Sequence, residues 1–356
     1  MREGRQVKIG LRSRRHAAPR KRRPRGLLWI LFALFGLGAL ATAMSGRRLL
    51  PGSTEPGPVP PPPEPEAPDA LAAGERHGPH EPHEPGAAPL SETLWIAGPS
   101  GNLYVRDGGE GAEESDGHAK PWPVLFVHSL AGNGGQWALQ LDHLRRHRRA
   151  LALDLRGHGD SDPADDGDYS IAGLANDIGA VADQLALRRF VLVGHSLGSA
   201  VAIEYAGRHP ERVAALLLVD PNGDMTQVPE EQMAPFLESL RADPLAELES
   251  YYRQLVVSGD RDASRWVLED LRLTHEDAIP AALEASLRYA PLPALARYPG
   301  PKQSVVSDMN SLPYSLHNLV QDLPVRLMAG TGHWLMMDRP EVFNALLDEF
   351  LAEVEG

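Results

Sequence analysis

The segment from Phe190 to Ala206 constrains the fold of this chain more than any other. It reads FVLVGHSLGSAVAIEYA: an apolar, β-branched run, then the pattern G-x-S-x-G, then apolar residues at helical spacing. This order predicts a strand, a sharp turn with Ser196 at its apex, and a helix. Gly194 and Gly198 leave room for the turn, and the serine hydroxyl would project above the sheet. We therefore expect Ser196 to be a nucleophile.

Two further motifs precede this turn. Val124–Asn133 reads VLFVHSLAGN, a strand that runs into a loop of small residues, and Ala150–Ser161 reads ALALDLRGHGDS. Together with the serine turn, and in this order, they resemble motifs of the α/β-hydrolase family, and the resemblance extends from about Leu90 to the C-terminus. It implies an α/β fold, a mostly parallel sheet covered by helices on both faces, and chemistry without a metal or a cofactor.

The loop after the first of these strands is similar to the oxyanion loop of the family. The resemblance implies that the N–H groups of Leu130 and Leu197 stabilise the negative charge of a tetrahedral intermediate. Ser129 stands where the family usually has glycine. We place Ser129, Trp137 and Trp334 in the substrate pocket.

The general base is expected near the end of the chain. Val325–Met328 is a short apolar strand, and the segment AGTGHWLMMD that follows places His333 in a loop at the end of that strand. A serine hydroxyl is a poor nucleophile until a positioned imidazole removes its proton. Sequence order and flanking pattern both match the family, so among the 14 histidines we assign this role to His333.

The acid of the triad has three candidates. In most relatives it follows strand seven in a G-x-x-D pattern, but the stretch SVVSDMN here has Ser307 for the glycine and Asn310 for the aspartate. Asp308 lies two residues earlier. Strand six ends directly in Asp220, a position at which some family members carry the acid. We rank Asp220 first and Asp308 second, since either could orient the imidazole, and place Asp224 a distant third.

Strand and helix patterns alternate through the domain. Strands are predicted at Leu94–Ile96, Leu103–Arg106, Val124–His128, Ala150–Asp154, Phe190–Gly194, Val213–Val219, Gln303–Val306 and Val325–Met328. Helices are predicted at Gly134–Arg146, Ile171–Leu187, Leu197–Arg208 and Pro340–Glu353. The parallel strands are near-continuous apolar runs, as burial on both faces requires. In the loop after the fourth strand, Arg156, His158 and Asp160 are interpreted as structural residues.

An insertion interrupts the alternation between strands six and seven. Residues 221–300 contain only helical patterns, and Pro235–Val256 and Ala263–Leu273 carry apolar residues at three- and four-residue spacing. We expect these helices to form a cap over the carboxyl end of the sheet and to roof the serine. A mostly apolar roof suits a small-molecule substrate with a hydrophobic acyl group.

These observations predict a serine hydrolase that cleaves carboxylic esters or related acyl compounds through an acyl-enzyme. A cofactor-free peroxidase or a carbon–carbon hydrolase would use the same triad. A binding protein could also retain the scaffold without turnover. Dehalogenases and epoxide hydrolases of this fold need a carboxylate nucleophile, and Ser196 counts against both.

The first 89 residues differ in composition from the rest. Residues 1–26 carry 11 Lys or Arg and one acid, residues 27–44 have no charge, and residues 45–89 are rich in Pro, Glu and Ala. We expect a cytoplasmic tail, an apolar segment that directs export, and a disordered spacer. The apolar segment fits a membrane anchor, which we favour, or a signal peptide cleaved near Ala43. The hydrolase domain, 90–356, is then expected outside the cytoplasm.

Charge and cysteine content restrict the partners and the chemistry. The formal net charge is −13, and residues 1–26 contribute +10, so the remainder carries −23 and is unsuited to nucleic acid. The chain has no cysteine, which excludes disulfides and a thiol nucleophile. His77, His80 and His83 recur in the Pro-rich segment, and we interpret them as part of a solvated linker rather than as a metal site. The oligomeric state stays open.

Overall fold

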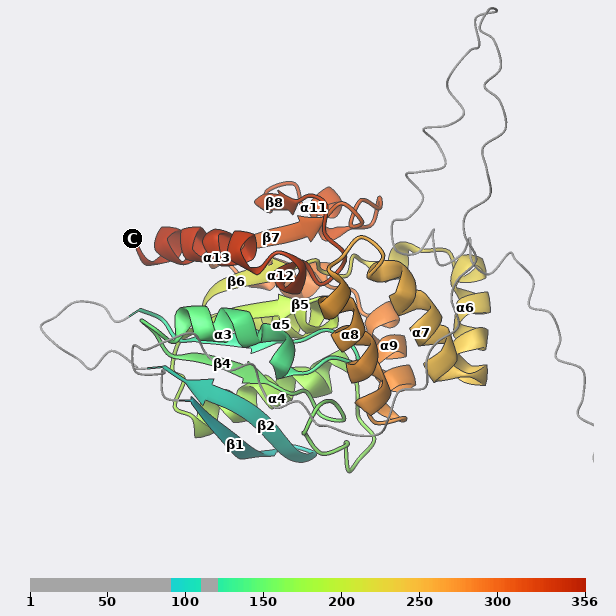
Figure 1. The fold of residues 1–356 in the computed structure, drawn as a ribbon, viewed down its shortest axis with the longest axis horizontal. Coiled ribbons are helices and arrows are strands. Elements are labelled where there is room, and N and C mark those ends of the chain that lie inside the picture. Colours follow the sequence, from blue (N-terminus) through green and yellow to red (C-terminus); the bar gives the residue numbers. More distant parts are fainter. Residues whose placement is uncertain (1–90, 110–120) are drawn as a thin grey trace, which may run out of the picture.

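The computed structural model describes residues 91–109 and 121–356. An eight-stranded sheet in the order β1-β2-β4-β3-β5-β6-β7-β8 forms the centre of this part (Figure 1). The strands are β1 (Ser91–Gly98), β2 (Gly101–Gly108), β3 (Val124–Val127), β4 (Ala150–Leu153), β5 (Phe190–His195), β6 (Val213–Val219), β7 (Lys302–Ser307) and β8 (Val325–Met328). β2 pairs antiparallel with β1 and β4, and all other neighbours are parallel. The predicted mostly parallel sheet is confirmed.

Helices flank the sheet on both faces, as predicted (Figure 1). They are η1 (Gly134–Trp137), α3 (Ala138–Leu144), α4 (Ile171–Gln184), α5 (Leu197–Arg208), α11 (Leu316–Leu319), α12 (Leu335–Asp338) and α13 (Pro340–Glu355). α4 packs against α5, and α3 packs against α13. The helix predicted from Gly134 begins as a 3-10 turn, because the Asn133 side chain accepts a hydrogen bond from the Gly135 N–H and turns the chain there.

Burial along each strand follows its place in the sheet. Every residue of β3, β4, β5 and β6 is buried, as two covered faces require. β8 departs from the expected two-sided burial, since Val325 and Leu327 are 38% and 60% exposed. The reason is that β8 is the last strand of the sheet and has a neighbour on one side only.

A group of helices stands between β6 and β7. It comprises η2 (Met225–Gln227), α6 (Glu230–Ala242), α7 (Pro244–Leu255), α8 (Arg261–Leu273), α9 (Ala278–Arg288) and α10 (Leu292–Arg297). The helical segment predicted from Pro235 divides at Asp243, whose carboxylate caps α7 by accepting from the Ala246 N–H. α6 to α9 lie together beyond one end of the sheet (Figure 1).

The last helix of the insertion belongs to the body of the fold. α10 packs against α5, and a Cβ on Gly207 of α5 would stand 2.5 Å from the Ala294 carbonyl oxygen of α10. Only a residue without a side chain permits this approach. The helices of the insertion therefore divide into α6 to α9, beyond the end of the sheet, and α10, which packs on α5.

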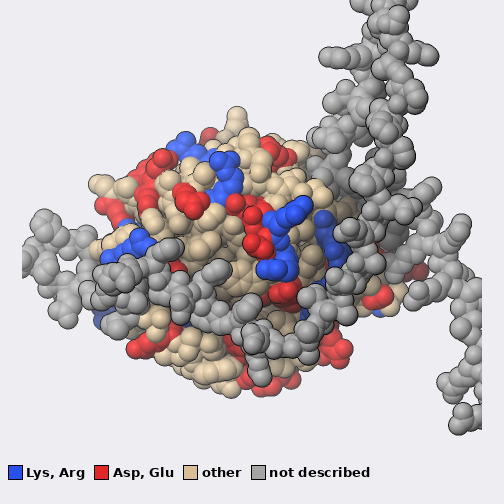
Figure 2. Space-filling model, viewed as in Figure 1, with Lys and Arg blue, Asp and Glu red and all other residues tan. Residues whose placement is uncertain are grey.

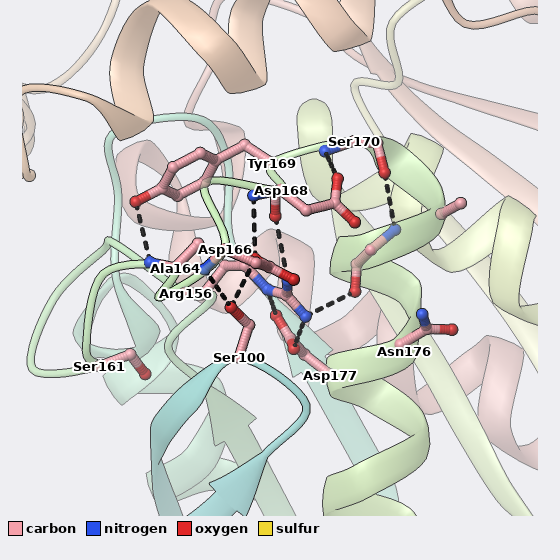
Figure 3. Close-up of polar contacts among 12 residues, drawn as sticks. Ser100, Arg156, Ser161, Ala164, Asp166, Asp168, Tyr169, Ser170, Asn176 and Asp177 are labelled. Carbon is pink, nitrogen blue, oxygen red and sulfur yellow. Dashed lines mark hydrogen bonds and ion pairs between the residues drawn. The ribbon is translucent and has the colours of Figure 1, made fainter.

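The loop after β4 is fixed by a buried ion pair. The Arg156 guanidinium binds both carboxylate oxygens of Asp177 on α4, at 2.5 and 2.8 Å, and donates to the carbonyl groups of Asp168 and Gly173 (Figure 3). Both charged side chains are almost fully buried. Removing either partner would leave an uncompensated buried charge, so Arg156 has the structural role expected from its loop.

The predicted tail, apolar segment and Pro-rich spacer all lie outside the described residues. Within residues 91–109 and 121–356, no helix has the length and apolar character needed to cross a bilayer. On the face drawn in Figure 2, basic and acidic side chains are interspersed over the surface.

Candidate active site

Ser196 occupies a strained turn between β5 and α5. Its φ of 53° and ψ of −114° lie in a region that residues other than glycine rarely adopt. Two glycines make the turn possible: a Cβ at Gly194 would stand 2.3 Å from the Gly198 carbonyl oxygen, and one at Gly198 would stand 2.5 Å from that of His128. The predicted strand, turn and helix are all present, and close backbone packing holds Ser196 at the end of the sheet.

His333 and Asp220 meet at the carboxyl ends of β8 and β6. The His333 Nδ1–H donates to Asp220 Oδ2 over 2.6 Å, and the two side chains are 13% and 2% exposed. Asp220 directly follows β6 and has a φ of 41°. A buried carboxylate on Nδ1 fixes the ring orientation and leaves Nε2 free to exchange a proton.

The end of β7 and the loop after it supply hydrogen-bond donors to this carboxylate. Asp220 Oδ1 accepts from the Ser307 N–H at 2.9 Å and from the Asn310 amide at 3.2 Å, and Oδ2 accepts from the Ser307 hydroxyl at 2.9 Å. These donors satisfy a carboxylate that is almost without contact to solvent. Ser307 and Asn310 are the two positions at which the chain departs from G-x-x-D, so this loop binds an acid instead of supplying one.

The other two acid candidates are engaged elsewhere. Asp308 is exposed, and its Oδ2 accepts from the Gly330 N–H at 2.7 Å. Asp224 caps η2 by accepting from the Thr226 N–H and hydroxyl. Of the three candidates, the structure brings only Asp220 to His333.

Ser196 and His333 line one cavity, together with Leu130 and Leu197. Its empty volume is about 430 Å³, counting the space that opens to solvent. The remaining wall comes from the segment after β6 and from α7 and α9, through Asn222, Met225, Tyr251, Tyr252, Leu255, Leu283, Ser286 and Leu287. This wall contains no Lys, Arg, Asp or Glu. A second cavity on the Asp220 side shares His333, Asn222, Met225, Tyr251 and Leu255 with the first.

Asn222 is a site residue that sequence reasoning missed. Its Oδ1 accepts from the Ser196 hydroxyl at 3.3 Å, and its Nδ2 donates to the Ser286 hydroxyl of α9 at 2.8 Å. Across the described ranges, no hydrogen bond joins the Ser196 hydroxyl to the His333 ring, a contact that often tightens only with substrate. A signal was available, because Asn222 lies two residues beyond Asp220, at the sheet edge where parallel strands place functional groups.

The three predicted pocket residues lie behind the cavity and not along its wall. Ser129, Trp137 and Trp334 are buried, and none of them lines either cavity. The Trp137 ring packs on Phe126 with 4.7 Å between centroids. The Trp334 indole and the Ser129 hydroxyl donate to the Gln136 side-chain oxygen, at 3.3 and 3.4 Å. Core packing of Trp137 and the shared acceptor of Ser129 and Trp334 thus engage these side chains outside the cavity wall.

Histidines with shifted pKa values surround the site. Burial, reinforced by the neighbouring His333, lowers the pKa of His195 well below its ordinary value. The neutral His195 ring donates from Nε2 to the His333 carbonyl oxygen at 2.9 Å and so holds the histidine loop. Burial also lowers the pKa of His128 to about 4 and that of His158 to about 3.

In the part of the chain that the structure describes, no cluster of three or more His, Asp or Glu is placed to hold a metal ion.

The chain is similar to known proteins. A family model described as alpha/beta hydrolase fold matches residues 123–263. The chain is 30% identical over 250 residues to 2-succinyl-6-hydroxy-2,4-cyclohexadiene-1-carboxylate synthase of Yersinia pestis (strain Pestoides F), covering 66% of this chain and 89% of that protein. It is 26% identical over 257 residues to 2-hydroxymuconate semialdehyde hydrolase of Pseudomonas sp. (strain CF600), covering 66% and 88%.

The fold is also found among solved structures. An esterase from Exiguobacterium antarcticum superposes with a TM-score of 0.62 at 18% identity, over 73% of this chain and all of the other. The family model and the related sequences indicate one family, and the topology of the sheet agrees with the fold of that family. The chain therefore belongs to the α/β-hydrolase family and is an enzyme of the hydrolase type.

Proposed function

We propose that this protein is a serine hydrolase that cleaves carboxylic esters or related acyl compounds through an acyl-enzyme on Ser196. One observation carries the proposal: the buried Asp220 carboxylate binds His333 Nδ1 at 2.6 Å, and His333 shares a cavity wall with Ser196. A nucleophile, a base and an orienting acid from three separate loops meet at one edge of the sheet.

The residues support a two-step reaction. His333 Nε2 removes the proton of the Ser196 hydroxyl as Oγ attacks the substrate carbonyl carbon, and the same proton then passes to the departing alcohol. Asp220 keeps the tautomer and stabilises the imidazolium that forms between these events. Water, activated by His333, next attacks the acyl-enzyme and releases the carboxylic acid and free Ser196.

Two backbone amides are proposed to bind the oxyanion. Leu197 is the first residue of α5, so its N–H has no acceptor within the helix and points from the positive end of the helix dipole. Leu130 lies in the loop after β3 and lines the same cavity. Fixed N–H dipoles near the developing negative charge are the largest single contribution to many acyl transfers.

The cavity wall favours an uncharged, mainly apolar acyl group. Leu130, Met225 and Leu283 are typical of its surface, and Asn222 with Ser286 supplies a polar contact. Hydrolysis of a carbon–carbon bond is the second candidate, since one relative is named as a semialdehyde hydrolase. A substrate that carries a carboxylate would find no cation in this wall, which favours neutral esters.

Replacement of the nucleophile tests the proposal. Ser196→Ala should lower hydrolysis of p-nitrophenyl butyrate by roughly 10⁴-fold or more and abolish labelling by a fluorophosphonate. Ser304→Ala is the matched control, because it removes a buried hydroxyl that donates to the Leu218 carbonyl oxygen within the sheet and lines neither cavity. Equal labelling of wild type and Ser196→Ala would refute the assignment.

We also propose that the domain is exported and tethered to a membrane. The support is the sequence: 11 basic residues precede an 18-residue segment without charge, and a Pro-rich spacer follows. The full chain should sediment with membranes and resist a high-salt wash, whereas a chain starting at residue 45 should not. Recovery of the full chain in the cytoplasmic fraction would contradict this.

A further inference from the structure

Helix α7 contacts both loops that carry the proposed catalytic groups. The Tyr252 hydroxyl donates a short hydrogen bond to the Leu130 carbonyl oxygen in the oxyanion loop. The Leu255 carbonyl oxygen accepts from the His333 N–H at 3.1 Å. Tyr252 and Leu255 are three residues apart, so they lie on the same side of the helix, and both line the cavity. One helix face therefore touches the oxyanion loop and the histidine loop.

The bond from Tyr252 reaches a strained part of the oxyanion loop. Ala131 follows Leu130 directly and has a φ of 50°, a left-handed value that costs energy for a residue with a side chain. The Leu130 carbonyl belongs to the peptide that joins these two residues. Holding its oxygen fixes that peptide plane, which carries the Ala131 N–H. It also restricts the rotation about the Leu130 Cα–C bond that links this plane to the preceding one, which carries the Leu130 N–H.

Helix α8 makes a second buried contact to the same loop. The Asp270 Oδ2 accepts from the Gln136 side-chain amide at 2.9 Å, and the other end of Gln136 accepts from Trp334 and Ser129. Gln136 in turn abuts the loop backbone, because a Cβ on Gly132 would stand 2.5 Å from its side-chain oxygen. The loop conformation is thus coupled to the position of α8.

Exposed ion pairs connect the inserted helices with one another. Arg272 of α8 binds Glu249 of α7 at 3.0 Å, and Arg241 of α6 binds Glu284 of α9 at 3.3 Å. Exposed pairs of this kind contribute little to stability individually. The contacts to the oxyanion loop are buried, so they are the ones able to enforce a geometry.

We propose that α7 and α8 position the oxyanion loop, with Tyr252 and Asp270 as positioning residues, so that the Leu130 N–H faces the cavity only while both helices are seated on the body. The inference rests on the proposed ester hydrolysis. Displacement of the two helices would break both buried contacts and let Ala131 relax, which disables the hole without touching Ser196 or His333. The seated insertion is then required for turnover as well as for enclosure of substrate.

Removal of single hydroxyl groups tests this inference. Tyr252→Phe keeps the ring that lines the cavity and deletes only the bond to Leu130. Tyr289→Phe is the matched control: its hydroxyl donates to Glu204 on α5 at 2.9 Å, so the variant also loses a contact between insertion and body, but none with the oxyanion loop. For both, kcat and KM for p-nitrophenyl butyrate, the inhibition constant of an apolar trifluoromethyl ketone, and Tm are measured.

The expected outcome separates positioning from stability. Tyr252→Phe should lower kcat roughly ten- to hundredfold and raise the inhibition constant of the ketone by a similar factor. It should change KM by less than about twofold. Tyr289→Phe should change kcat and the inhibition constant by less than about threefold. Asp270→Leu should reproduce the kcat loss if it folds, and Tyr252→Phe decides the matter if it does not.

Two results would overturn the inference. One is an equal kcat loss in Tyr252→Phe and Tyr289→Phe, and the other is a rise in KM alone for Tyr252→Phe. Failure of the proposed function looks different: either the wild-type protein hydrolyses no acyl ester, or Ser196→Ala retains full activity. The two failures are therefore distinguishable in the same set of assays.

Discussion

The serine turn and the acid site hold their residues in opposite ways. Ser196 is fixed mainly by its own neighbours, since Gly194 packs on the Gly198 backbone and the Ser199 hydroxyl donates to the Gly194 carbonyl oxygen at 2.6 Å. The main distant contact is that of Gly198 with the backbone of Val127 and His128. Asp220 is fixed by partners 87 to 113 residues away in the chain, on the loops after β7 and β8. Local sequence therefore specifies the first site, whereas the second exists only when three strands are aligned.

This contrast explains which loop carries the acid. Ser307 at the end of β7 and Asn310 in the loop after it stand where the pattern G-x-x-D has glycine and aspartate, and both side chains donate to Asp220. At the end of β7, hydrogen-bond donors stand where the pattern G-x-x-D has an acceptor. At the end of the neighbouring strand β6, Asp220 supplies the acceptor. The ends of β6 and β7 thus form one hydrogen-bonded unit.

The largest expected effect breaks the acid site. Asp220→Asn should lower kcat by about 10⁴-fold, because the amide cannot stabilise the imidazolium and favours the wrong tautomer. Asp308→Asn, which removes a charge on the same rim but leaves His333 untouched, should change kcat by less than about threefold. Steady-state kinetics on p-nitrophenyl butyrate decide between them, and the reverse ranking would reassign the acid to Asp308.

A side chain at Gly198 should overpack the serine turn and distort it. Gly198→Ala would bring a Cβ to 2.5 Å from the backbone oxygens of both Val127 and His128, which cannot withdraw. We expect a loss of about 1–3 kcal/mol in the free energy of unfolding and a displaced nucleophile. Gly179→Ala in α4 is the matched control, since its nearest neighbour is a Tyr205 ring carbon at 3.7 Å. Chemical denaturation should show the control unchanged or slightly more stable.

A smaller effect should follow when the cradle of the acid is weakened. Asn310→Ala removes the donor at 3.2 Å from Asp220 and the bond to the Pro221 carbonyl oxygen. We expect kcat to fall roughly tenfold with KM little changed, because the carboxylate loses one of several donors. An unchanged kcat in this variant would show that Ser307 and His333 suffice to hold Asp220.

The smallest expected effect concerns the thermal stability of the protein at acidic pH, which depends on two buried histidines. The buried His128 and His158 rings lie 5.2 Å apart, and their pKa values, about 4 and about 3, are below the unfolded value of 6.5. Their contribution to stability is complete above pH 6.5 and is lost as pH falls through those folded values. Tm should therefore decline between pH 6.5 and 4, and less steeply in His158→Asn, which cannot titrate.

One buried carboxylate works against this decline. Burial raises the pKa of Asp270 to about 6, so its contribution is complete below its unfolded value of 3.8 and is lost as pH rises through 6. Asp270→Asn should steepen the fall of Tm on acidification. A Tm profile that is flat from pH 7 to 4 in wild type and in His158→Asn would contradict the assignment of neutral buried rings.

Periodicity predicted most of the sheet and much less of the insertion. β6 and β8 have the predicted bounds, and so does α5, because buried apolar runs and the glycine turn are local signals. The break at Asp243 and the attachment of α10 to α5 were missed. Both depend on which part of the molecule a helix packs against. The spacing of apolar residues predicts a helix but not its packing partner.

For the candidate site, the sequence by itself determined the residues that geometry forces: Ser196 in its glycine-flanked turn, His333 at the end of a strand, and an acid at the end of β6 or β7. Only the tertiary structure showed that Asp220, which the sequence ranked ahead of Asp308, contacts His333, added Asn222, and placed Ser129, Trp137 and Trp334 outside the cavity wall. The physical reason is range. A turn is specified by sterics within five residues, whereas a hydrogen bond between loops depends on strand register and on which side chains the core has room to bury.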